Sequence, residues 1–269
     1  MTQHAHNSTA SQVPNPALGE AQIDALRSSV ARLRNLAAPL PEQHLTRGAY
    51  PTEWAVAQVL SHLGSGAVIT QRRLEDTLAS QQTPDDVAPG VWETWNAKSP
   101  VTQRDDALAA DAALLARLEA FAPEDRARFR SAMGPMTLDF AQFVGMRLNE
   151  HAFHTWDIEV VADPQATLPK RVAALVVDNL ELVARFTGRP TGETTTITVA
   201  TTAPARGFTV DLSPHTVTFR TGSDGADANL DLPAEAFARL VYGRLDPAHT
   251  PAGNHDAALD MLRIVFPGP

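Results

Sequence analysis

The chain has 269 residues, a formal net charge of -9 and 43% hydrophobic residues, which is enough apolar material for a sizeable core. The negative charge argues against a nucleic-acid partner, because phosphate binding needs clustered lysine and arginine side chains. The sequence has no cysteine, which excludes disulfides, thiolate metal ligands and a cysteine nucleophile. A transition-metal site must therefore use histidine, aspartate or glutamate, and thiol chemistry needs a thiol from solution.

The N-terminal segment is polar, and we expect a flexible tail at 1–18 in which His4 and His6 are solvated. This segment has no apolar core like that of a signal peptide. No apolar run elsewhere approaches the length of a membrane span. We therefore expect a cytoplasmic protein without a membrane partner.

Apolar residues then recur at helical spacing in four long segments. We expect helices at 19–38, 53–78, 104–121 and 137–161, with Thr52 as the N-cap of the second. Further expectations are an ordered loop over the proline-rich stretch 81–100 and a short helix after Pro123. Four long helices without a strand signal predict a four-helix bundle over 19–165.

The pattern changes in the C-terminal part of the chain. A fifth helix is expected at 169–186. Alternating, β-branched stretches predict strands at 194–202, 207–212, 216–221 and 228–232. Helices are expected at 234–242 and 255–265. This order predicts a small α+β domain over 166–269, and an α+β fold class for the chain as a whole.

The fourth bundle helix carries an unusual set of ionisable residues. At about 100° per residue, His154 lies roughly +40°, Asp157 roughly -20° and Arg147 roughly +60° from Glu150. Phe143 projects onto the same stripe, so this stripe is expected to face the core. Ionisable side chains in a core need partners or a metal. Glu and His at positions i and i+4 project side by side, as metal ligands on one helix do.

A third ligand has to come from another helix, and His62 is the best candidate. It lies between Val59 and Ile69 on the apolar arc of its predicted helix. Gly64 and Gly66 beside it leave room for close packing or for a ligand. The spacing therefore suggests a site for one divalent metal between two helices of the bundle.

The spacing alone leaves a second interpretation open. Arg147, Glu150, His154 and Asp157 can also form a buried salt-bridge ladder without any metal. A single histidine on an apolar face is usually a hydrogen-bonded core residue. His151 points about 100° away from the stripe and is a poorer candidate for a ligand.

Two motifs resemble those of a known family. The segment 52–66, TEWAVAQVLSHLGSG, resembles the first signature of the mycothiol-dependent maleylpyruvate isomerase family. The pattern Arg-x-x-Glu-x-x-x-His-x-x-Asp over 147–157 resembles the second. The resemblance implies a DinB-like four-helix bundle in which His62, Glu150 and His154 bind a divalent metal, usually zinc.

The resemblance extends over most of the chain. The C-terminal half is similar to the family's second domain, which is related to sterol carrier proteins, and 232–244 is its most recognisable segment. The family places an arginine of this domain near the active site. Arg244 is therefore the candidate catalytic residue, which would clamp a substrate carboxylate bidentately or stabilise an enolate. Asp157 either orients a metal ligand or pairs with Arg147.

The resemblance also implies a thiol-dependent enzyme. A metal with three protein ligands keeps open positions and can lower the pKa of a bound thiol, which mycothiol would supply. The implied reaction is cis–trans isomerisation of maleylpyruvate or thiol S-transfer to an electrophile. The alternative is a non-catalytic, metal-stabilised sensor or small-ligand-binding module, which a fourth protein ligand would favour. A monomer and a homodimer both remain open.

Other aromatic and histidine residues receive simpler interpretations. Trp92 and Trp95 are expected to cap the bundle rather than line a pocket. His215, His249 and His255 share no helical face, so we expect them to be surface or capping residues.

Overall fold

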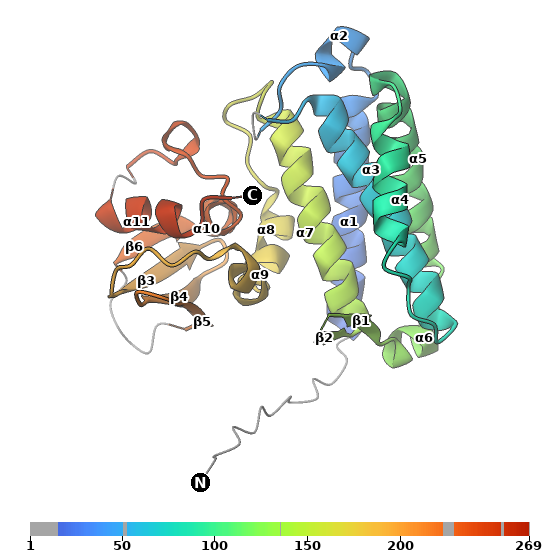
Figure 1. Cartoon of the computed structure of the whole chain (residues 1–269). Coiled ribbons are helices and arrows are strands. Elements are labelled where there is room, and N and C mark those ends of the chain that lie inside the picture. The colour runs from blue at the N-terminus through green and yellow to red at the C-terminus, as the bar shows by residue number, and fades with distance from the viewer. Residues whose placement is uncertain (1–15, 51–52, 135, 223–228, 254–255, 269) are drawn as a thin grey trace.

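The chain folds into a helical half followed by a small α+β half, which confirms the predicted fold class (Figure 1). The two halves lie side by side. None of the described helices is long and apolar enough to cross a membrane. The computed structural model describes residues 16–50, 53–134, 136–222, 229–253 and 256–268.

The bundle consists of the four long helices that the periodicity predicted. Helix α1 packs on α7 and α3 packs on α5, and α3 also contacts α7. The bounds are α1 (Pro16–Ala37), α3 (Val56–Leu78), α5 (Pro100–Glu119) and α7 (Phe140–Glu159).

The predicted tail at 1–18 is wrong for its last three residues, because α1 already begins at Pro16. Proline suits the first turn of a helix, where its missing amide hydrogen has no partner in any case. His4, His6 and the predicted N-cap Thr52 lie outside the described residues.

The loop predicted over 81–100 is wrong, because helix α4 (Val87–Asn96) occupies most of it. Pro89 falls in the first turn, where a helix tolerates proline. Trp95 is buried against α3, and a Cβ added to Gly64 would lie 2.3 Å from its ring. Close packing over a glycine therefore fixes α4 against the bundle. The shorter helices α2 (Glu42–Leu45) and α6 (Pro123–Arg128) complete this half, and α6 confirms the helix expected after Pro123.

A hairpin that the sequence did not predict precedes α7. Strands β1 (Ser131–Met133) and β2 (Met136–Leu138) pair antiparallel. Helix α7 then begins at Phe140, three residues later than expected, because Asp139 caps it. The Asp139 carboxylate accepts a hydrogen bond from the Gln142 amide at 2.8 Å, and the Gln142 side chain accepts one from the Asp139 amide at 3.0 Å.

The fifth predicted helix is two helices in the structure. Helix α8 (Lys170–Val177) ends before Asp178, and α9 (Leu180–Thr187) begins after Asn179. Aspartate and asparagine are weak helix formers, because their side chains compete for nearby backbone groups.

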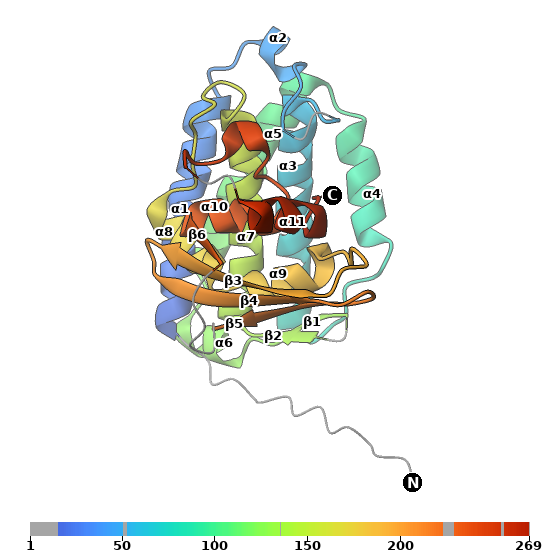
Figure 2. The same cartoon turned by 90° about the vertical axis from the view of Figure 1, so that its left-hand side faces the viewer.

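The four predicted strands are present and form one sheet in the order β5-β4-β3-β6. Strands β3, β4 and β5 pair antiparallel, whereas β6 runs parallel to β3. Helices α10 and α11 lie over one face of the sheet (Figure 2). The bounds are β3 (Thr195–Thr202), β4 (Arg206–Leu212), β5 (Val217–Thr221), β6 (Leu230–Pro233), α10 (Ala234–Val241), the 3-10 turn Pro247–His249 and α11 (Ala257–Val265).

One hydrophobic cluster runs from the bundle into the C-terminal half. It includes Phe153 and Trp156 of α7, Val176 of α8 and Phe237 of α10, all of which are almost fully buried. Burial on this scale holds the C-terminal half against α7. The domain boundary at 165/166 stays a prediction, but residues after it are in a position to act on α7.

Candidate metal centre

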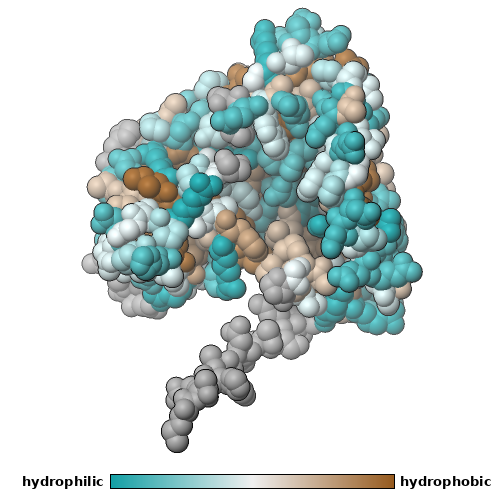
Figure 3. Space-filling model, in the orientation of Figure 1, coloured by the Kyte–Doolittle hydropathy of each residue, from teal (hydrophilic) through white to brown (hydrophobic). Residues whose placement is uncertain are grey.

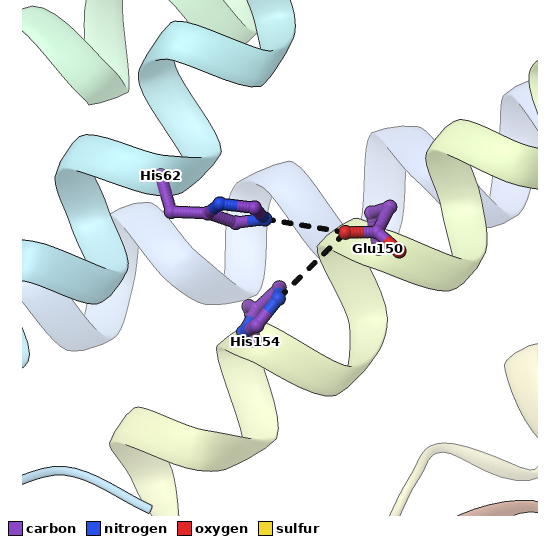
Figure 4. A group of neighbouring side chains, drawn as sticks. All are labelled: His62, Glu150 and His154. Atoms are coloured by element: carbon purple, nitrogen blue, oxygen red, sulfur yellow. Dashed lines mark hydrogen bonds and ion pairs between the residues drawn. The ribbon is translucent and has the colours of Figure 1, made fainter. Parts of the chain in front are cut away.

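Helices α3 and α7 bring the three predicted metal ligands together (Figure 4). The Oε2 atom of Glu150 lies 3.2 Å from Nε2 of His62 and 3.7 Å from Nε2 of His154. One ligand atom from each residue falls within 4.8 Å of the others. Two imidazole nitrogens and one carboxylate oxygen therefore converge from two helices, as a small chelating site requires.

The site is open on one side. The Glu150 side chain keeps 46% of its surface exposed and His62 keeps 34%, whereas His154 keeps only 11%. Figure 3, drawn in the orientation of Figure 1, shows a surface that is hollowed between the bundle and the C-terminal half. A small molecule can therefore approach from solvent while His154 stays fixed in the bundle.

The protonation states suit metal binding. Burial acts to raise the pKa of Glu150, but its hydrogen bond with His62 and the nearby His154 and Arg147 outweigh burial and hold the pKa at about 2. Burial lowers the pKa of His154. Near neutral pH, Glu150 is therefore a carboxylate and His154 a neutral imidazole, which are the forms that bind a metal.

Asp157 fixes the orientation of His154. The Nδ1 atom of His154 donates a hydrogen bond to Oδ2 of Asp157 at 2.8 Å. This contact leaves the Nε2 lone pair of His154 directed toward Glu150 and the shared space. An outer carboxylate of this kind orients a metal-binding histidine and raises its basicity.

Arg244 reaches Asp157 from the C-terminal half. Its Nε and Nη2 atoms donate to the two carboxylate oxygens at 2.7 and 2.8 Å, and Nη1 donates to the carbonyl of Tyr242 at 2.8 Å. Arg244 is 4% exposed and Asp157 is fully buried. The predicted bidentate clamp on a substrate carboxylate is therefore not the arrangement seen, because Asp157 holds two of the three guanidinium nitrogens and the Tyr242 carbonyl holds the third.

A glycine turn aims Arg244 at α7. Gly243 has a φ of +68°, and a Cβ there would lie 2.1 Å from Gly268. The amides of Gly243 and Arg244 donate to the carbonyls of Leu240 and Arg239 at 2.9 and 2.7 Å, which is a Schellman ending of α10. The chain therefore reverses directly before Arg244 and points its side chain back to the bundle.

Of the two alternatives for Asp157, pairing with Arg147 is not seen, because Asp157 contacts His154 instead. Arg147 donates instead to Asp111 of α5 and, at 2.9 Å, to the carbonyl of Leu63. Asp111 also contacts Nε2 of His151 at 3.2 Å. The four residues of the alternative salt-bridge ladder therefore belong to two separate networks, one toward the bundle core and one at the candidate metal centre.

Sequence reasoning missed Asp111, although a signal for it was present. Asp111 lies between Leu108, Leu114 and Leu118 on the apolar arc of α5, and it is 2% exposed. His151 is fully buried beside it, and its Nδ1 atom lies 2.8 Å from the Ser29 hydroxyl. A charged residue inside an apolar stripe predicts a buried partner of opposite charge.

The remaining candidates lie away from the three ligands or play simpler parts. Trp95 covers the bundle as expected, whereas Trp92 is 47% exposed. His215 is exposed, and His249 contacts Asp246 through Nδ1 at 2.8 Å. His255 lies outside the described residues.

Comparison with known proteins places the helical half of the chain in a family. Residues 26–159 match the family model of the mycothiol maleylpyruvate isomerase N-terminal domain. The bundle belongs to this family. The match spans all three candidate ligands and confirms the family that the two motifs predicted. None of the curated protein sequences matches the chain significantly.

Two solved structures share the fold of this chain. A crystal structure of the mycothiol-dependent maleylpyruvate isomerase superposes with a TM-score of 0.63 at 11% identity, covering 88% of this chain and 96% of that one. A crystal structure of a histidine-to-alanine mutant of the mycothiol-dependent maleylpyruvate isomerase superposes with a TM-score of 0.62 at 10% identity. This match covers 84% of this chain and 89% of that one. The shared fold therefore includes the C-terminal half.

Metal content tests the site directly. We expect the purified protein to hold close to one divalent metal per chain, and His62→Ala, Glu150→Ala and His154→Ala each to lose it, because each removes one of three ligands. Elemental analysis measures the content. His215→Ala is the matched control and should keep its metal. Full metal in all three ligand variants would refute the site.

Replacing Arg244 tests the link between the two halves. Arg244→Ala leaves a fully buried Asp157 carboxylate without its cation, so the free energy of unfolding should fall by about 3–5 kcal/mol. Metal affinity should fall about tenfold or more, because Asp157 then orients His154 poorly. Urea unfolding and a metal titration measure the two effects.

Arg206→Ala is the matched control for this substitution. Arg206 also donates two hydrogen bonds to one carboxylate, that of Asp178, but their side chains are 39% and 50% exposed. Arg206→Ala should lower the free energy of unfolding by less than about 1 kcal/mol. Equal effects of the two substitutions would mean that the Arg244 contact does not hold the centre.

Proposed function

We propose that this chain is a metal-dependent enzyme that uses a low-molecular-weight thiol, mycothiol, on a small electrophilic substrate. The reaction is either cis–trans isomerisation of maleylpyruvate or transfer of the thiol sulfur to an electrophile. The observation that carries the proposal is the convergence of His62, Glu150 and His154 in a family whose name includes mycothiol and this isomerisation. The chain itself supplies no thiol, because it has no cysteine.

The donor set fits a divalent metal, for which zinc is our proposal. Two imidazole nitrogens and a carboxylate oxygen form a common set of ligands for catalytic zinc. Among the described residues, no fourth histidine, aspartate or glutamate joins the group. An open position favours catalysis over a closed structural metal, and therefore an enzyme over a metal-stabilised sensor.

The protein's own residues prepare the centre. Asp157 accepts the Nδ1 hydrogen of His154, and Arg244 donates to both oxygens of Asp157, so Nε2 of His154 is free to act as a ligand. Glu150 supplies negative charge from its exposed side. A divalent metal bound to these residues would lower the pKa of an incoming thiol and supply positive charge near the substrate.

Arg244 enters the proposal as a positioning residue. Its contacts with Asp157 favour an action through His154, in place of direct contact with the substrate. Its positive charge is buried close to the centre, and Asp157 and Glu150 raise its pKa against the opposing effect of burial. A guanidinium group stays charged in this place and can hold both carboxylate oxygens of Asp157 at once.

The proposal predicts a thiol requirement. With zinc and mycothiol present, the protein should isomerise maleylpyruvate or consume the thiol against a panel of electrophiles, because the chain has no nucleophilic sulfur of its own. Chelation of the metal or omission of the thiol should reduce either rate to background. Absorbance of the substrate and a free-thiol assay follow the two reactions.

His215→Ala should keep the full rate, whereas His154→Ala should lose it. Isomerisation without net thiol loss would identify an isomerase, and stoichiometric thiol loss a transferase. A reaction that runs at full rate without any thiol would contradict the proposal and favour hydrolysis by metal-activated water.

A further inference from the structure

A tryptophan lies directly on the candidate ligands. The ring centroid of Trp54 is 5.3 Å from that of His62 and 5.9 Å from that of His154. The two imidazole rings are themselves 4.5 Å apart. The indole is nearly parallel to the His154 ring, with 15° between the planes. Three rings therefore form one cluster at the metal centre, at distances typical of favourable aromatic contacts.

The two histidines differ in what else holds them. His154 is oriented in its ring plane by the hydrogen bond to Asp157. Within the part of the chain that the structure describes, the only hydrogen-bond partner of the His62 ring is Glu150. Both atoms of this hydrogen bond are proposed metal ligands, so a bound metal would take the place of the bond. In the metal-bound form, Trp54 would be the main remaining restraint on the His62 ring.

Trp54 itself is held by the backbone around it. Its carbonyl accepts a hydrogen bond from the Ala49 amide at 2.7 Å, and Gly48 and Ala55 form an antiparallel bridge. The Tyr50 amide in turn donates to the carbonyl of Asp157 at 3.0 Å. The segment that carries Trp54 is therefore attached to α7, the same helix that carries His154 and Glu150.

We propose that Trp54 is a positioning residue, whose indole fixes the ring planes of His62 and His154 for metal binding. The inference rests on the metal site of the proposed function and adds a residue to it. The indole lies nearly parallel to the His154 ring, with the ring centroids 5.9 Å apart, and a metal-bound imidazole, which is electron-poor, would strengthen such a contact.

Zinc affinity in ring-retaining and ring-removing variants tests this role. Trp54→Leu keeps apolar bulk but has no ring face, so we expect about tenfold weaker zinc binding, as for loss of an outer partner of a ligand. Trp54→Phe keeps an aromatic face that can stack, so its dissociation constant for zinc should stay within about threefold of that of the parent protein. Competition with a chromophoric chelator measures the dissociation constants, and melting temperatures of the metal-free proteins show whether the fold is equally stable.

Fluorescence supplies a second readout that a purely structural role would not change. Zinc titration should alter the tryptophan emission of the parent protein and of Trp92→Phe. It should not alter the emission of Trp54→Phe, because that variant lacks the tryptophan that lies beside the His62 and His154 rings. Trp92→Leu, at an exposed tryptophan, is the affinity control.

The outcomes separate the two proposals. Trp54→Leu with the affinity of Trp92→Leu would overturn the role of Trp54 while leaving the metal site intact. A parent protein that binds no zinc at His62, Glu150 and His154 would overturn the proposed function as well. Weaker binding by Trp54→Leu with rescue by Trp54→Phe supports the inference.

Discussion

The buried carboxylate of Asp157 is the group on which the arrangement of the centre depends. A fully buried negative charge is costly unless it is neutralised and hydrogen-bonded. Arg244 from the C-terminal half and His154 from α7 meet both needs at once. The same contacts therefore join the two halves of the chain and set which nitrogen of His154 faces the ligand space. The C-terminal half is in this sense part of the candidate metal centre.

Helix α7 serves two polar networks that point in different directions. Arg147 contacts Asp111 in the core of the bundle, where the pKa of Asp111 is lowered because its partners outweigh the effect of burial. Glu150 and His154 lie toward the open side, next to His62. A helix that is fixed on its core side by an ion pair can present its ligands at constant positions, which is what a preorganised site requires.

Much of the fold and the ligand set could be predicted from the sequence, because both depend on local spacing. Helical periodicity predicted the four bundle helices, and Glu150 and His154 lie on one face for the same reason. The partners of Arg147 and Arg244 could not be predicted, since a helical projection gives a direction but not what a neighbouring helix places there. The prediction missed helix α4 because Pro89 and Gly90 are typical of loops, whereas burial of Trp95 stabilises the helix.

The central claim is that His62, Glu150 and His154 hold one metal that keeps a position open for a thiol. X-ray absorption spectroscopy of the zinc-loaded protein, with and without mycothiol, tests this claim most directly. The account predicts only nitrogen and oxygen neighbours at about 2.0–2.2 Å without the thiol, and one added sulfur neighbour at about 2.3 Å with it. A zinc spectrum that mycothiol leaves unchanged would contradict the account.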